Sequence, residues 1–151
     1  GVRVGCYDGT VDGERLHEGA VKALAATSTL RASAGHDARV TLKEQRGTVR
    51  TLPDAHSASV DCLTFYSSLL LSGDFAGMLF AWNVTSEAAP PVMTQKAHAE
   101  CVSAVASGAS WLATASWDHT VKLWDPDRLD LLQTSPACGA VLLDLAVSGR
   151  S

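Results

Sequence analysis

The fold class of this chain can be inferred from the stretch Leu112-Ala-Thr-Ala-Ser-Trp-Asp-His-Thr-Val-Lys-Leu-Trp-Asp125. Small and apolar residues alternate up to a polar turn at Trp117-Asp118-His119, and a second alternating run follows and ends at Trp124-Asp125. Alternation of this kind is typical of a β-strand with one buried face, and a polar turn between two such runs joins neighbouring strands. The stretch therefore predicts two short antiparallel strands with a turn at Asp118.

The same pattern recurs twice upstream, which makes it an internal repeat. Each copy begins at a histidine, and the three histidines His17, His56 and His98 are 39 and 42 residues apart. The residues four and seven positions later are aliphatic, and the residue six positions later is small (Val21, Ala23 and Leu24; Val60, Cys62 and Leu63; Val102, Ala104 and Val105). Spacing of this length is that of a β-propeller blade, in which four short antiparallel strands form one unit.

The repeat divides the chain into three whole units with a fragment at each end. The units are expected at 17–53, 54–96 and 97–134, with the end of a preceding blade at 1–16 and the start of a further one at 135–151. The expected strands are 20–26, 29–34, 39–43 and 48–52, then 59–65, 68–73, 77–82 and 91–96, then 101–107, 111–116, 120–125 and 130–134. One segment does not fit, because the nine residues from Asp8 to His17 leave no room for an outer strand and its turn.

These residues resemble the WD-repeat β-propellers, and the resemblance covers nearly the whole chain. His98 stands for the histidine of the family's Gly-His pair, with Ala97 in place of the glycine, and Trp124-Asp125 is the Trp-Asp pair itself. The second unit reads Trp82-Asn83 there, and the first has Lys43 in the tryptophan position. The resemblance implies an all-β fold, a partial WD-repeat propeller of antiparallel four-stranded blades. The phrase Ala115-Ser-Trp-Asp118 also resembles the C-terminal propellers of BEACH-domain trafficking proteins.

The resemblance also implies a buried hydrogen-bond network in each blade. The turn aspartate accepts from the histidine, the histidine meets a hydroxyl, and the hydroxyl meets the indole N–H. The corresponding residues are His17, Ser33 and Asp37 in the first unit, His56, Ser72 and Trp82 in the second, and His98, Thr114, Asp118 and Trp124 in the third. The second unit has Ala76 in the aspartate position, which leaves Asp74 as a candidate acceptor for His56.

A catalytic interpretation of the same residues is weaker. Histidine, hydroxyl and aspartate are the parts of a hydrolase triad. A nucleophile, however, would need to be exposed in a pocket beside an oxyanion hole, and the chain has no Gly-x-Ser-x-Gly motif. We therefore expect no enzyme activity. The five histidines are spread over separate units, so that no metal site and no cofactor are expected either.

Composition narrows the classes of partner. The net charge is −4 and the basic residues do not cluster, which disfavours nucleic acid and anionic membranes as partners. No apolar run approaches the roughly 20 residues that span a bilayer. Cys6, Cys62, Cys101 and Cys138 have no zinc-site or CxxC spacing, and free thiols suit the cytoplasm. Because repeat residues begin at once, we expect a longer protein whose remaining blades, or self-association, cover the blade flanks.

A ring precedes the turn position in every copy. These residues are Tyr7, His36, Phe75 and Trp117, and the strand–turn–strand geometry predicts that all four project from one face of the propeller. Lys22, Asp61 and Ser103, five residues after each histidine, are expected on the same face. The resemblance implies that this face contacts partners, and aromatic rings are typical of interface hot spots.

The sequence thus predicts a non-catalytic scaffold or adaptor that binds a protein or peptide on this face. A lysine and an aspartate on neighbouring blades suit a peptide of mixed charge better than nucleic acid. Two alternatives stay open. The rings can instead cap their own blades and pack on the neighbouring blade. The segment can also be purely structural, completing a ring or assembling a larger complex through its blade flanks.

Overall fold

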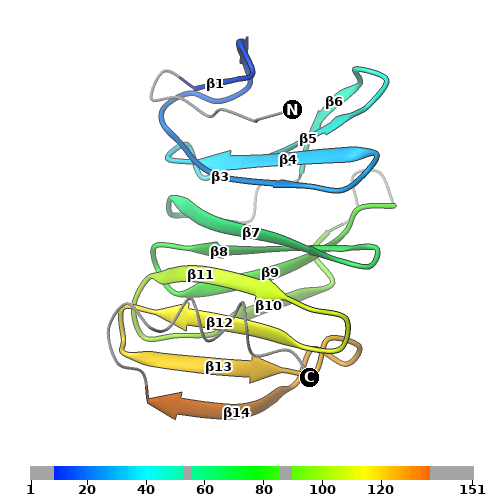
Figure 1. The fold of residues 1–151 in the computed structure, drawn as a ribbon. Helices are drawn as coiled ribbons and strands as arrows, with labels where there is room; N and C mark the ends of the chain where they lie inside the picture. Colours follow the sequence, from blue (N-terminus) through cyan, green and yellow to red (C-terminus); the bar gives the residue numbers. More distant parts are fainter. Residues whose placement is uncertain (1–8, 53–55, 86–89, 137–151) are drawn as a thin grey trace.

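Three consecutive four-stranded β-sheets, preceded by a two-stranded hairpin, form the computed structural model, which describes residues 9–52, 56–85 and 90–136 (Figure 1). Each sheet has four antiparallel strands in chain order, so each is a meander. The described residues form strands and turns only, and none of them belongs to a helix that could cross a bilayer. The prediction of an all-β fold built from four-stranded blades is confirmed.

The strands lie where the repeat predicts them, within two residues at either end. The first blade has β3 (Val21–Ala26), β4 (Leu30–Gly35), β5 (Val40–Glu44) and β6 (Val49–Thr51); the second has β7 (Val60–Tyr66), β8 (Leu69–Asp74), β9 (Met78–Asn83) and β10 (Met93–Lys96); the third has β11 (Val102–Ser107), β12 (Leu112–Ser116), β13 (Thr120–Trp124) and β14 (Leu131–Pro136).

The blades pack face against face, with β7 in contact with both β3 and β11 (Figure 1). One apolar cluster, which includes Leu42, Leu63 and Phe80, lies between the first two blades, and a second lies between the last two. Alternating inward residues of neighbouring sheets form both clusters, and burial of a side chain such as Leu42 contributes about 1.5–3 kcal/mol. Gly73 permits the close approach of the third blade, since a Cβ there would lie 2.7 Å from Val102.

The segment before the first blade corrects one expectation. A short hairpin of β1 (Thr10–Val11) and β2 (Glu14–Arg15) occupies it, so an outer strand is present in shortened form. Its two-residue turn, Asp12-Gly13, has φ angles of 51° and 85°, as a type I′ hairpin requires. The Gly9 carbonyl accepts from the N–H of His17, as the Gly77 carbonyl accepts from His98. Nine residues are enough because this turn needs only two.

Candidate functional site

Three equivalent turns present the predicted rings. His36, Phe75 and Trp117 each follow the second strand of a blade directly, and the third turn residue has a positive φ in every case (Ala38 62°, Gly77 88°, His119 68°). Each ring residue donates its backbone N–H to a carbonyl just before the inner strand of its own blade (His36 to Ala20, 2.9 Å; Phe75 to Ser59, 2.8 Å; Trp117 to Cys101, 3.1 Å). The same hydrogen bond therefore fixes the start of each turn.

A β-bulge places the second set of predicted residues. In β7, Val60 pairs with Asp74 and Cys62 pairs with Gly73, so that Asp61 is the extra residue. Lys22 in β3 and Ser103 in β11 are skipped in the same way. A bulge bends its strand and re-aims the extra side chain, and here all three such side chains line one cavity.

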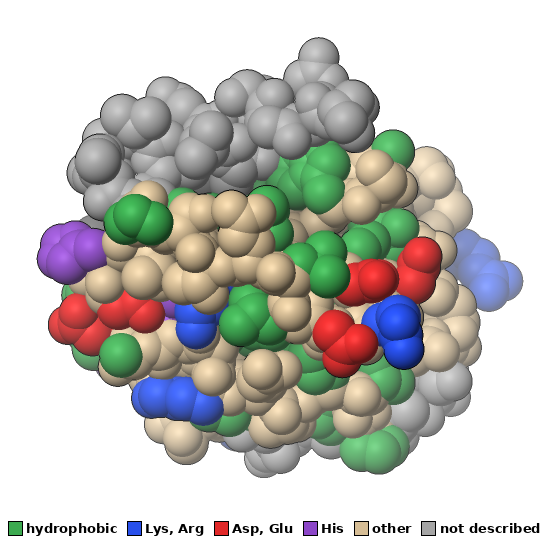
Figure 2. All heavy atoms as spheres, turned by 90° about the horizontal axis from the view of Figure 1, so that it is seen from below, with side chains coloured by type: hydrophobic (Ala, Val, Ile, Leu, Met, Phe, Trp, Pro, Cys, Tyr) green, Lys and Arg blue, Asp and Glu red, His purple; other side chains and the backbone are tan. Residues whose placement is uncertain are grey.

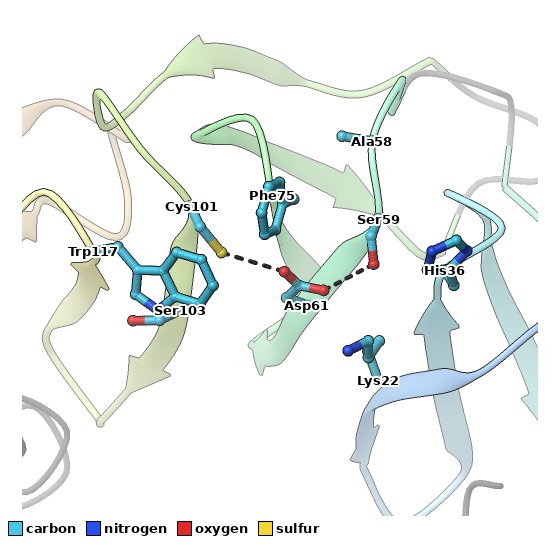
Figure 3. A pocket seen from close by; sticks show the side chains of 9 residues that line it. All are labelled: Lys22, His36, Ala58, Ser59, Asp61, Phe75, Cys101, Ser103 and Trp117. Carbon is cyan, nitrogen blue, oxygen red and sulfur yellow. Dashed lines mark hydrogen bonds between the residues drawn. The ribbon is translucent and has the colours of Figure 1, made fainter. Parts of the chain in front are cut away.

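The structure brings together all the predicted face residues that it describes. A cavity of about 640 Å³ is lined by Lys22, His36, Asp61, Phe75, Ser103 and Trp117, together with Ala58, Ser59 and Cys101 (Figure 3). We call the first six of these residues the ring-bearing face. Tyr7, the seventh predicted member, lies outside the described residues. The cavity spans three blades, since its lining residues come from the turns and inner strands of all of them.

Phe75 and Trp117 form an aromatic pair across neighbouring blades. Their ring centroids are 5.4 Å apart and their planes meet at 83°, the edge-to-face arrangement that aromatic quadrupoles favour. Phe75 is 53% exposed and Trp117 is 55% exposed. The rings contact each other across the blade boundary, as the alternative of packing on a neighbouring blade also implies, and more than half of each ring is exposed.

Asp61 lies at the centre of the cavity and is held by two neutral donors (Figure 3). The Ser59 hydroxyl donates to Oδ1 at 2.9 Å, and the Cys101 thiol donates to Oδ2 at 3.2 Å. Burial, reinforced by this hydrogen bond, raises the pKa of Cys101 to about 12. The thiol therefore stays protonated at neutral pH and acts as a donor, because only a thiolate is a strong nucleophile.

Three lining residues were not predicted to belong to this face: Ala58, Ser59 and Cys101. Ser59 and Cys101 occupy the same repeat position as Ala20, three residues after the histidine, which supplies the carbonyl acceptor for each ring residue. That position in the repeat was the available signal. Cys101 was expected within an inner strand, whereas it directly precedes β11 and its side chain reaches Asp61 of the second blade.

The third blade contains the complete buried network. The Trp124 indole N–H donates to Thr114 Oγ1 at 3.0 Å, and Thr114 Oγ1 lies 2.8 Å from His98 Nε2. Because the Asp118 carboxylate can only accept, the proton of a neutral His98 ring lies on Nδ1 and is donated to Asp118 at 3.0 Å, and Nε2 then accepts from the Thr114 hydroxyl. Desolvation lowers the pKa of His98 despite the neighbouring Asp118, which is consistent with a neutral ring. His98 and Thr114 are fully enclosed, which makes the network structural.

Asp118 is stabilised in its charged form. Burial alone would raise its pKa, but hydrogen bonds from the Thr120 hydroxyl, the Ala99 N–H and His98 together hold the pKa well below the ordinary aspartate value. Asp37 in the first blade behaves alike, because N–H groups of Glu18 and Arg39 and the His17 ring outweigh burial and lower its pKa.

In the second blade Asp74 replaces the missing turn aspartate. Asp74 Oδ2 lies 2.7 Å from His56 Nδ1, and its Oδ1 accepts from the N–H groups of Ala76 and Met78. His56 Nε2 lies 2.7 Å from Ser72 Oγ, which also accepts from the Trp82 indole at 2.8 Å. The alanine at position 76 therefore does not deprive His56 of a carboxylate.

The first blade keeps only part of the network. His17 lies 3.0 Å from Asp37 and 2.8 Å from Ser33 Oγ, but Lys43 stands where the indole would be. The Lys43 ammonium instead pairs with Glu14 of the short β1–β2 hairpin. Within the described ranges no cluster of three or more His, Cys, Asp or Glu side chains is placed to hold a metal ion.

Comparison with known proteins agrees with this geometry. The family model described as "WD domain, G-beta repeat" matches residues 89–125. Dynein axonemal assembly factor 10 of Xenopus tropicalis is 32% identical over 116 residues, which cover 66% of this chain and 32% of that protein. The ribosome biogenesis protein WDR12 homolog of Aedes aegypti is 31% identical over 96 residues, covering 46% and 22%. The chain thus spans about a third or less of the length of these relatives.

Solved structures share the fold. The computationally designed Ika8 protein superposes with a TM-score of 0.78 at 23% identity, covering 90% of this chain and 46% of that one. The designed Ika4 protein gives a TM-score of 0.73 at 22% identity, covering 82% and 76%. At these identities the likeness concerns the fold alone. The narrower resemblance to BEACH-type propellers stays a prediction.

Proposed function

Because the chain belongs to the WD-repeat family of β-propellers, we propose that it is a non-catalytic interaction module whose ring-bearing face binds a protein or peptide. WD repeats generally mediate protein–protein interaction, and relatives are named for dynein assembly and ribosome biogenesis, which supports a scaffold or adaptor role. The observation that carries the proposal is the exposed Phe75–Trp117 pair at the mouth of a cavity spanning three blades.

Two half-exposed rings that already contact each other lose little conformational freedom when a partner covers them, and aromatic side chains dominate the energy of many interfaces. A cavity of about 640 Å³ has room for one or two side chains of a peptide. Lys22 and Asp61 add charges of opposite sign on neighbouring blades, which suits a polypeptide. We propose a cytoplasmic protein partner, and neither nucleic acid nor membrane.

A peptide display library tests the proposal directly. The wild-type chain should select a peptide consensus, and the Phe75→Ala/Trp117→Ala variant should bind those peptides about 1–4 kcal/mol more weakly with an unchanged melting curve. The matched control removes two other exposed apolar side chains, Val92→Ala/Leu132→Ala, and should keep full affinity. Equal binding by all three proteins would exclude the ring-bearing face.

A structural role through the blade flanks is the second candidate. Leu131 and Leu132 on β14 are 44% and 65% exposed, and Figure 2, seen from the β14 side, shows apolar side chains among separate Lys/Arg and Asp/Glu side chains. Such a surface suits a neighbouring blade or a second copy of the chain. Light scattering distinguishes the two roles, because a flank contact predicts association that Leu131→Ser/Leu132→Ser abolishes.

A further inference from the structure

Asp61 forms no ion pair with any of the described residues. Its two hydrogen-bond donors, the Ser59 hydroxyl and the Cys101 thiol, are both neutral. A partly buried carboxylate usually has a charged partner, because burial without one is unfavourable. Here the two neutral donors orient the carboxylate and leave further lone pairs for a third donor.

The surroundings of Asp61 also favour a positive guest. Phe75 and Trp117 line the same cavity, and the negative face of an aromatic ring attracts ammonium and guanidinium groups. Figure 3 shows Phe75 beside Asp61, with Trp117 and Cys101 on one side and Ser59 on the other. A cation in this position would meet the carboxylate and the ring faces together.

Lys22 is the one competing cation of the cavity lining. It is exposed, comes from the bulge of the neighbouring blade, and makes no ion pair within the described chain. Its charge reaches Cys101, the thiol that donates to Asp61, because it opposes the rise of the Cys101 pKa. Since Lys22 is exposed, solvent weakens its effect on Asp61. Because Lys22 repels other cations, removal of its charge should strengthen the binding of any cation at Asp61.

Given the proposed function, we infer that the partner inserts a lysine or arginine side chain into this cavity, where Asp61 pairs with its charge and Phe75 and Trp117 contact its stem and head. The aliphatic stem of such a side chain packs on apolar surface while the charged head meets the carboxylate. An aromatic or aliphatic anchor from the partner would gain nothing from Asp61. The charge of the inserted residue is therefore what the test must isolate.

The probe is N-acetyl-arginine N-methylamide, and its matched control is N-acetyl-citrulline N-methylamide, which has nearly the same shape without the charge. Binding to the chain is followed by NMR through the indole N–H signal of Trp117, assigned with a Trp117→Phe variant. We expect a saturable shift in the millimolar range, as for a weak single-residue ligand, and at least about tenfold weaker binding of the citrulline compound.

Three variants make the assignment specific. Asp61→Asn, which keeps the shape of the side chain, should weaken arginine binding about tenfold. Lys22→Gln should strengthen it roughly twofold. Asp130→Asn, an exposed carboxylate on the outer loop beside Arg128, should change nothing. Thermal melting of each variant shows that the fold is intact.

The outcomes separate this inference from the proposed function. Equal binding of the arginine and citrulline compounds, no effect of Asp61→Asn, or no shift up to roughly 50 mM probe would each overturn the inference. If library peptides then still required Phe75 and Trp117 but not Asp61, the face would bind its partner by apolar contact, and the proposed function would stand. Peptides that require neither ring would contradict both.

Discussion

Trp117 and Trp124 belong to one hairpin and lie in opposite environments. Trp117, in the turn, is 55% exposed, whereas Trp124, at the end of β13, is 1% exposed and donates its indole N–H to Thr114. The second blade repeats the contrast, with Phe75 at 53% and Trp82 at 2%. Residue type is thus no guide to the role of these rings. Their position in the repeat decides whether a ring stabilises a blade or is presented to a partner.

Replacement of the buried ring should have the largest effect on stability. Trp124→Ala removes a side chain from the second apolar cluster and should lower the free energy of unfolding by about 3–5 kcal/mol. Trp117→Ala, in the same hairpin, should cost less than about 0.5 kcal/mol. Urea unfolding followed by circular dichroism measures both. Similar losses for the two variants would remove the contrast between the two positions.

Replacement of the aspartates in the buried hydrogen-bond networks should have the next largest effect on stability. Asp118→Ala removes the carboxylate that accepts from the Ala99 backbone N–H and from the His98 ring, which keeps only the Thr120 hydroxyl beside Nδ1, and should destabilise the chain by about 1–3 kcal/mol. Asp74→Ala should lie at the upper end of that range, because Asp74 is fully buried. Ala76→Asp should bring no gain, since His56 already has Asp74 as its acceptor. The exposed Asp130→Ala is the control, and urea unfolding followed by circular dichroism measures the free energy of unfolding of each variant.

A smaller effect is expected from pH. The pKa of His98 is lowered in the folded chain by burial, so the unfolded chain binds the proton first. The stability contributed by the neutral ring is fully present above about pH 6.5 and is lost as pH falls through the lower folded pKa. Asp118, whose pKa is also lowered, adds a further loss only below about pH 4.

Thermal melting at neutral pH and at about pH 5 checks this expectation. The wild-type melting temperature should fall with acidification, and His98→Gln, destabilised at both pH values, should show a smaller fall. His119→Asn removes an exposed turn histidine and should behave as the wild type. A melting temperature that rises on acidification would contradict a neutral His98.

Repetition made the strands, the turns and most of the candidate site predictable. The spacing of His17, His56 and His98 predicts the ends of every strand in the three blades to within two residues. The position before each turn predicts which rings line the same cavity. Local departures from the period were not predictable in the same way. Asp74 lies two residues before the expected aspartate; the sequence named it as a candidate acceptor for His56, and the structure shows that its carboxylate makes this contact.

Contacts between blades, the bulges and the short hairpin were not predicted. The Cys101–Asp61 hydrogen bond joins two blades, and a pattern within one blade carries no information about contacts between blades. The bulges that turn Lys22, Asp61 and Ser103 to the cavity are set by pairing with the adjacent strand, which the alternation of a single strand does not reveal. The short β1–β2 hairpin was missed because its Asp12-Gly13 turn lies outside the repeat pattern.

Binding of a library-selected peptide to the Phe75→Ala/Trp117→Ala variant, measured by calorimetry beside a melting curve of the same sample, shows whether the two exposed rings bind a partner. We expect affinity weakened by about 1–4 kcal/mol with melting unchanged, because both rings are more than half exposed. Unchanged affinity with a lowered melting temperature would contradict it, and would show that Phe75 and Trp117 serve the blades as Trp82 and Trp124 do.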